Sequence, residues 1–168
     1  MTATDRIARR LGIGLGICLA AVALVSWRVP GGERTLGADV RMEALQTGPV
    51  GVAPLQPFLK KPSLLPGQSV SGSVVLRNQT GVALALRLRA LPSVRDLDRL
   101  LRVRVSAGDT TLYDGQLGGL RAGAAPLRLA ATRSATVRVT ASLPGFVQSG
   151  FQGRIVDVGL QIDSRNVR

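Results

Sequence analysis

Two aspartates in the middle of the chain, Asp96 and Asp98, are the most closely spaced carboxylates among its 168 residues. Such a pair could contribute to a Ca²⁺ site, but calcium takes about six to eight oxygen ligands, and no other acidic residue is close in sequence. Arg95, Arg99 and Arg102 stand three or four positions from these aspartates, the spacing of ion pairs along a helix. We therefore interpret the segment as a salt-bridged, solvent-exposed helix face.

Histidine is absent from the chain. Its absence excludes His-based acid–base catalysis, the Ser-His-Asp and Cys-His nucleophilic schemes, and His-ligated zinc. The single cysteine, Cys18, excludes an intramolecular disulfide. Asp109 and Asp114 each stand beside a glycine, which is typical of turns. We predict no catalytic, cofactor-binding or metal-binding residue and interpret the chain as a protein without enzymatic activity.

Several other residues have both a functional and a structural interpretation. Lys60 and Lys61 lie among prolines and could contact an anionic surface, although we expect a solvated loop. Asn78-Gln79-Thr80 fits the glycosylation sequon, yet together with Gly81 it also indicates a turn. The aromatic residues are few and scattered, and we expect these four to be core or interface anchors: Trp27, Tyr113, Phe146 and Phe151.

The chain carries a net charge of +12, and 20 of its 22 basic residues are arginine. A basic exported domain attracts anionic envelope polymers, and we expect Arg87 and Arg89, on the polar face of one strand, to contribute to such binding. The alternative is a compositional origin of the charge, because Ala, Gly, Leu and Val are abundant as well. Specific nucleic-acid binding is not predicted, because few aromatic side chains are present to stack on bases.

An apolar N-terminal segment precedes all of these residues. Leu11 to Trp27 form 17 consecutive uncharged residues directly behind a region with three arginines. This pattern is typical of a signal peptide or a membrane anchor, and the length of the segment fits both. Residues 1–27 are therefore either a cleaved signal or an anchor whose N-terminus lies in the cytoplasm. Residues 28–38 indicate a linker, and residues 39–168 a single extracellular or cell-surface domain.

Alternating apolar and polar residues predict strands in most of this domain. Residues 69–77 alternate, and 82–91 alternate with Val82 as the first inward position. Ile155 to Ile162 repeat the pattern at the end of the domain. Gly48 to Pro66 contain five prolines, which predicts a loop or at most an edge strand.

A short segment behind Ser93 has a different period. Its apolar residues recur every three or four positions, which predicts a helix of about two turns capped by Ser93. We therefore expect an all-β fold: an antiparallel β-sandwich, jelly-roll-like or Ig-like, with about seven or eight strands and one short helix. A hydrophobic helix formed by residues 11–27 would precede it.

The order of turns and strands from Leu65 onward carries a resemblance to a known family. Leu65-Pro66-Gly67-Gln68 precedes a strand that runs into Asn78-Gln79-Thr80-Gly81. Leu112-Tyr113-Asp114-Gly115-Gln116-Leu117 follows, then Leu143-Pro144 at a strand end, then Phe151-Gln152-Gly153 before the last strand. Over residues 39–163 this order resembles the camelysin/TasA group of exported bacterial proteins.

The resemblance implies a jelly-roll-like sandwich and a role at the cell surface or in a biofilm matrix. In some members an N-terminal strand of one subunit completes the sheet of the next, and Asp39 to Leu45 would be that donor strand here. Phe151 replaces the tyrosine of the family pattern. Members have also been described as metalloproteases, but without histidine the resemblance implies no peptidase site in this chain.

Two functions follow as expectations. The first is an exported, non-enzymatic cell-surface or extracellular-matrix structural protein that self-associates through its sheet edges. The second is a membrane-tethered binding module, held by residues 11–27 where these are retained, whose basic face captures anionic envelope polymers. No cofactor is expected for either.

Overall fold

A computed structural model describes residues 37–91 and 95–167, and for Arg95 and Asp96 it describes the backbone alone. The predictions for residues 11–27, Cys18, Trp27 and Ser93 lie outside the described residues. The described part belongs to one compact unit, Arg34–Arg168. Within it, no helix has the length and apolar composition needed to span a membrane.

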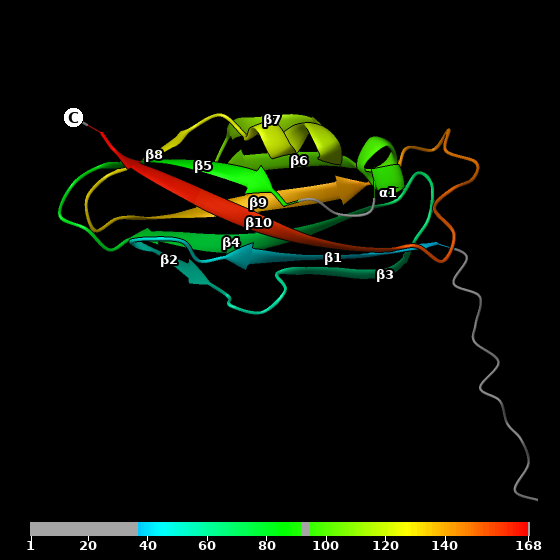
Figure 1. Ribbon diagram of the computed structural model, residues 1–168, viewed down its shortest axis with the longest axis horizontal. Coiled ribbons are helices and arrows are strands. Elements are labelled where there is room, and N and C mark those ends of the chain that lie inside the picture. The colour runs from blue at the N-terminus through cyan, green and yellow to red at the C-terminus, as the bar shows by residue number, and fades with distance from the viewer. Residues whose placement is uncertain (1–36, 92–94, 168) are drawn as a thin grey trace, which may run out of the picture. The chain divides into compact units, whose positions relative to one another are not determined.

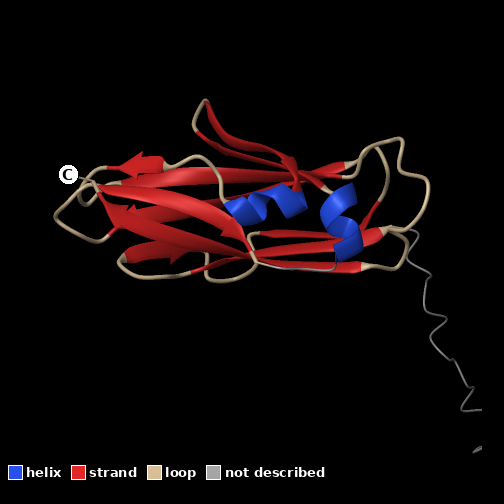
Figure 2. Ribbon diagram, turned by 45° about the horizontal axis from the view of Figure 1, so that its top comes forward, coloured by secondary structure: helices blue, strands red, loops and turns tan. Residues whose placement is uncertain are grey.

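Two five-stranded sheets pack face to face (Figure 1), which confirms the predicted all-β sandwich. The first sheet has the strand order β3-β1-β10-β5-β8 and the second β2-β4-β9-β6-β7. Apart from strands the described residues form only two short helical segments (Figure 2), α1 and the 3₁₀ helix η1. In chain order the elements are β1 Ala38–Leu45, β2 Val50–Ala53, β3 Leu59–Leu64, β4 Ser69–Asn78, β5 Leu84–Ala90, α1 Arg95–Leu100, β6 Arg102–Ala107, β7 Thr110–Gln116, η1 Leu117–Ala122, β8 Leu127–Leu129, β9 Ser134–Ser142 and β10 Ile155–Asn166.

The alternating residues divide between core and surface as the sequence predicts. In β10, Val156, Val158, Leu160 and Ile162 are all buried, and the residues between them face outward. A period of two places every second side chain on one face of a strand, so a strand half covered by a second sheet needs this pattern. The short helix predicted behind Ser93 is confirmed as α1, which packs Leu97 into the core, whereas the second helical segment, η1, was not predicted.

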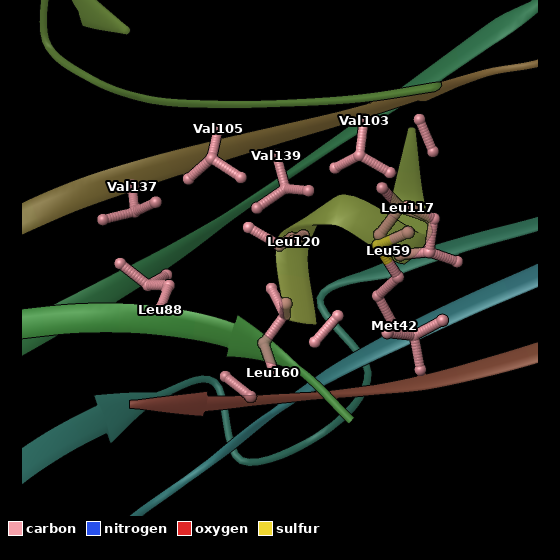
Figure 3. Packing of buried hydrophobic residues seen from close by; sticks show 14 of the residues in the cluster. Met42, Leu59, Leu88, Val103, Val105, Leu117, Leu120, Val137, Val139 and Leu160 are labelled. Carbon is pink, nitrogen blue, oxygen red and sulfur yellow. The ribbon is translucent and has the colours of Figure 1, made fainter. Parts of the chain in front are cut away.

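The core is aliphatic, as the scarcity of aromatic residues requires. Its largest fully buried side chains are leucines together with Met42. The helix η1 contributes Leu117 and Leu120, which lie among Val103, Val139 and Leu88 in the close view of the packing (Figure 3). Gly118 and Gly119 would favour a loop at this point of the chain, but burial of Leu117 and Leu120 stabilises a helical turn there.

The purely antiparallel arrangement is also wrong, because β1 and β10 run parallel over seven residue pairs, from Asp39↔Ile155 to Leu45↔Gln161. A parallel pair needs a long crossover connection, and here eight intervening strands supply it. The strands number ten among the described residues, more than the seven or eight expected. The additional ones, β2 and β3, lie in the proline-rich segment, and both are edge strands as that segment predicts.

Smaller differences concern where strands begin and end. Val82 was expected to face inward, but it is 48% exposed in the connection before β5. Asp114 was expected in a turn, but it lies inside β7, where cross-strand contacts hold it in extended backbone. Asp109 does lie in the turn between β6 and β7, as predicted.

The edges of both sheets are short, covered or interrupted. β2 and β8 have four and three residues, and β3 carries Lys60, Lys61 and Pro62. On the side of β7 a connecting segment bridges the two sheets: the Ala124 amide donates to the Leu88 carbonyl at 2.8 Å, and the Ala125 amide to the Leu112 carbonyl at 2.9 Å. Such features are those by which sandwich proteins avoid pairing with other strands.

Candidate functional site

The outer face of the second sheet differs in composition from the outer face of the first. Its five strands carry four arginines and a single acidic residue, together with ten serines and threonines. The strands of the first sheet carry seven basic and four acidic residues and only two hydroxyl side chains. The second sheet therefore presents the more uniformly basic and the more hydroxyl-rich surface.

Strand register brings these side chains together. Ser71 of β4 pairs with Thr140 of β9, Thr140 with Arg104 of β6, and Arg104 with Asp114 of β7. The row on one side consists of Ser69, Ser142, Arg102 and Gln116. The row on the other side consists of Ser73, Arg138 and Ser106. We call this surface the arginine–hydroxyl face: Ser69, Ser71, Ser73, Arg102, Arg104, Ser106, Arg138, Thr140 and Ser142.

One carboxylate orients two of the arginines. The Arg104 guanidinium donates to the Asp114 carboxylate at 2.6 and 2.9 Å, and the Arg102 Nε donates to its other oxygen at 2.9 Å. The hydrogen bonds from Arg104, and then those from Arg102, hold the pKa of Asp114 below its usual range. Both arginine side chains are still about 60% exposed, and each has more N–H donors than its bonds to Asp114 use.

The hydroxyl side chains extend this surface over β4 and β9. Ser71 and Thr140 hydrogen-bond to each other at 2.7 Å. A shallow hollow of about 250 Å³ lies beside them, lined by Ser69, Arg102, Arg104, Asp114, Thr140 and Ser142. Guanidinium groups bind carboxylate, sulfate and phosphate through paired N–H donors, and hydroxyls bind sugar hydroxyls in either direction. A flat surface of this chemistry suits an extended, anionic and hydroxylated chain.

The prediction of a solvated helix face is wrong for Asp98, whereas the side chains of Arg95 and Asp96 lie outside the described residues. Asp98 is 5% exposed and is bonded to Arg121 of η1, so it lies in the interior and not on a solvated face. Arg102 is bonded to Asp114 on the sheet surface instead. The described residues contain no group of three side chains of the metal-binding types His, Cys, Asp and Glu.

Arg87 and Arg89 belong to the other sheet. Arg89 lies 3.7 Å from the Asp163 carboxylate, and Asp163 is also the register partner of Arg87 across β5 and β10. The stems of both arginines pack against Gly123. This surface has mixed charge, and the arginine–hydroxyl face is the stronger candidate for an anionic ligand.

Three other predicted residues have structural roles. Asn78 is fully buried, and its amide donates to the carbonyls of Val82, Leu129 and Ala130, so the sequon is a structural corner. Tyr113 packs partly against the core and Phe151 is buried, in agreement with their predicted role. Phe146 is 83% exposed and is not a core residue.

Sequence reasoning did not single out Arg104 and Arg138. The available signal was alternation, because Arg102-Val103-Arg104 and Thr136-Val137-Arg138 place arginines on the polar face of their strands. The pairing of β6 with β9 and of β9 with β4 was needed to show that these positions share one surface.

Comparisons with known proteins do not assign this chain to a family. No protein-family model matches it, and no curated protein does. A solved structure described as "AvmM Catalyzes Macrocyclization in Alchivemycin A Biosynthesis" aligns with 72% of this chain and 89% of that chain, at 16% identity and a TM-score of 0.35. A similarity of this size says nothing about the chemistry of the present chain.

Proposed function

We propose that this chain is an exported, non-enzymatic surface module that binds an anionic polymer on its arginine–hydroxyl face. The observation that carries the proposal is the register that places Arg102, Arg104 and Arg138 on one sheet face with the hydroxyls of β4 and β9. Export rests on the apolar segment 11–27 behind a basic N-terminus.

The geometry favours a polymer over a small molecule. Neighbouring strands lie about 4.8 Å apart and alternate residues of a strand about 6.8 Å apart, so the face offers a regular grid of donors without a deep cleft. An extended chain with a repeated anionic group can contact several positions of this grid at once. Each contact is weak at a solvated surface, and the number of contacts supplies the affinity.

The test compares two double variants of the full-length protein with equal net charge. Arg104→Gln/Arg138→Gln changes the arginine–hydroxyl face, and Arg128→Gln/Arg165→Gln changes two exposed arginines of the other sheet. Binding to dextran sulfate is measured by biolayer interferometry between 50 and 300 mM salt, over which the Debye length falls from about 14 to about 6 Å. We expect the first variant to bind at least about tenfold more weakly, with a salt slope lower by about two, and the second to change about threefold or less. Equal loss in both variants would show that net charge alone drives binding and would refute the proposed site.

A second candidate function is self-association into a surface or matrix structure, as the camelysin/TasA resemblance and its jelly-roll description suggest. The observation that favours it is the position of β1, an N-terminal strand that lies between β3 and β10. The first strand of a domain can be supplied by a second copy with all of its contacts unchanged. Addition of a strand from a second copy to the existing edges of the two sheets is less favourable, because these edges are short, charged or covered.

Locking β1 into its own sheet tests this second candidate. Arg41 and Asp157 are register partners on the outer face, so Arg41→Cys/Asp157→Cys in a Cys18→Ser background joins β1 to β10 when oxidised. Light scattering and electron microscopy of the full-length protein then follow assembly against concentration. Assembly of the reduced but not the oxidised form would support strand exchange, and assembly of both forms would refute it.

A further inference from the structure

The end of the sandwich at which β1 begins carries an exposed apolar surface. The Gly153 amide donates to the Gly37 carbonyl at 3.1 Å, and the Gly67 amide to the Leu143 carbonyl at 2.7 Å. These bonds gather the start of β1, the β3–β4 turn and the β9–β10 loop, and α1 lies at the same end (Figure 1). We call this the loop end: residues 37, 65–68, 95–100 and 143–154.

Phe146 is the feature of the loop end that the sandwich does not use. It is 83% exposed, the largest exposed fraction among the large hydrophobic residues of the described chain. It borders a hollow of about 430 Å³ whose other apolar lining includes Leu100, Pro144 and Val147. Leu65, in the adjoining turn, is 36% exposed. An exposed phenyl ring beside an apolar hollow is typical of a docking surface.

Basic side chains border this apolar surface. Arg99 of α1 and Arg102 of β6 line the hollow, and no acidic residue is among its lining residues. Among the described carboxylates nearby, Asp98 is bonded to Arg121, Asp39 accepts from the Ser63 amide, and Asp114 pairs with Arg104 and with Arg102 of the rim itself. An apolar tip with a cationic rim is the chemistry of an interfacial membrane contact.

The position at which β1 begins identifies the occupant. The described chain begins at Gly37 in the loop end, and the apolar segment Leu11–Trp27 precedes it by nine residues. Nine residues span at most about 30 Å even when fully extended. A retained anchor would therefore keep the loop end close to the bilayer surface, whereas the opposite end, with the Val82 turn and the C-terminus, would point away.

We propose that the loop end rests on the anionic surface of the membrane, with Phe146 inserted between lipids and Arg99 against headgroup phosphates. This inference rests on the anchor part of the proposed function, and the residues that carry it, Phe146 and Arg99, lie outside the arginine–hydroxyl face. Insertion of one phenyl ring is a small contribution beside that of an apolar anchor, so it orients a tethered domain rather than holding a free one.

Fluorescence quenching by lipid tests the inference in the full-length protein. Trp27 is the only tryptophan, so Trp27→Phe provides a background without tryptophan. Phe146→Trp is compared with Val82→Trp, a half-exposed position at the opposite end of β4 and β5, after reconstitution into nanodiscs with brominated anionic lipid. We expect the indole of the Phe146→Trp variant to be quenched at least about twofold and to emit at shorter wavelength, and the indole of the Val82→Trp variant to show neither effect.

Other results would overturn the inference in distinguishable ways. An unquenched indole in the Phe146→Trp variant refutes the membrane contact, and a blue shift that depends on protein concentration without quenching assigns the surface to a second copy. Quenching that is equal in zwitterionic nanodiscs refutes the role of the anionic surface charge, and quenching unchanged by Arg99→Gln refutes the contact between Arg99 and the headgroup phosphates. Intact mass and cell fraction of the native chain test anchor retention separately, and dextran sulfate binding by Phe146→Trp tests the polymer site separately.

Discussion

Replacement of Asn78 provides a quantitative test of the structure, because one buried amide connects three chain segments. Its Nδ2 donates to the carbonyls of Val82, Leu129 and Ala130 at 2.8, 3.2 and 3.0 Å. Its Oδ1 accepts from the backbone amide and the hydroxyl of Thr80 at 2.9 and 2.7 Å. The side chain therefore joins the β4–β5 connection to the β8–β9 connection across the two sheets.

Asn78→Ala removes these bonds, although the Thr80 hydroxyl still donates to the Val82 carbonyl and the Arg133 amide to the Ala130 carbonyl. Two N–H groups serve three carbonyls, so we count two net donor bonds and two acceptor bonds at about 1 kcal/mol each, and expect a loss of about 3–4 kcal/mol in the free energy of unfolding. For a domain of this size the corresponding fall in Tm is about 10 °C. Thr80→Ala removes only the hydroxyl and should cost about 1 kcal/mol.

Asn78→Asp separates hydrogen bonding from packing, because the two side chains have nearly equal shape. A carboxylate directs only acceptors at three carbonyl oxygens, so at pH 7 this variant should be less stable than Asn78→Ala. Burial without a cation would raise the folded-state pKa of the new carboxyl above its unfolded value of about 3.9. The loss of stability of Asn78→Asp relative to the wild-type protein should therefore become smaller as the pH falls below the raised pKa, because the protonated carboxyl group can donate a hydrogen bond.

Urea denaturation followed by circular dichroism measures all three variants between pH 4 and pH 8. A loss below about 1 kcal/mol for Asn78→Ala would contradict the assigned network. The same conclusion would follow if Asn78→Asp at pH 7 were as stable as the wild-type protein.

Three further changes test the core, the packing of the sheets and the surface site. Leu120→Ala should lower the free energy of unfolding by about 2–5 kcal/mol in urea denaturation, because Leu120 is fully buried, whereas exposed Leu55→Ala should change it by less than about 0.5 kcal/mol. Gly72→Ala places a methyl group against the Phe58 carbonyl and should cost about 1–3 kcal/mol by thermal denaturation, whereas Gly81→Ala meets open space. Arg104 and Arg102 lower the pKa of Asp114, so these ion pairs are complete above the unfolded pKa of about 3.9 and are lost as the pH falls through the lowered value. Asp114→Asn should reproduce this loss at pH 7 and steepen the salt dependence of dextran sulfate binding by about one.

Which residues of a strand face inward was predictable from the sequence wherever the strand is half buried. The inward residues of β4 and β10 follow directly from alternation, because the second sheet removes one face of each strand from water. The edge position of the proline-rich segment was predictable for a similar reason, since proline lacks the N–H that a central strand needs. These inferences require only the local sequence and the physical chemistry of one strand.

Pairing across the sheets was not predictable from the sequence. β1 and β10 pair in parallel although they are the first and last strands of the described chain, and no local pattern distinguishes this from an antiparallel pair. Asp114 was assigned to a turn because Asp-Gly is a strong turn signal, and the ion pairs with Arg102 and Arg104 prevail over that preference in the fold. Burial of Asp98 depends in the same way on Arg121, which is distant in sequence.

The candidate site depends both on which residues of each strand face outward and on the register between neighbouring strands. Alternation alone places Arg104 and Arg138 on polar faces, but a slip of one residue between β6 and β9 would turn one of the two strands and separate them. The buried residues of both strands, Val103, Val105, Val137 and Val139, prevent such a slip, because it would expose two of them. The aliphatic core thus fixes the positions of the surface arginines, and this is why an anionic polymer would meet them as one face.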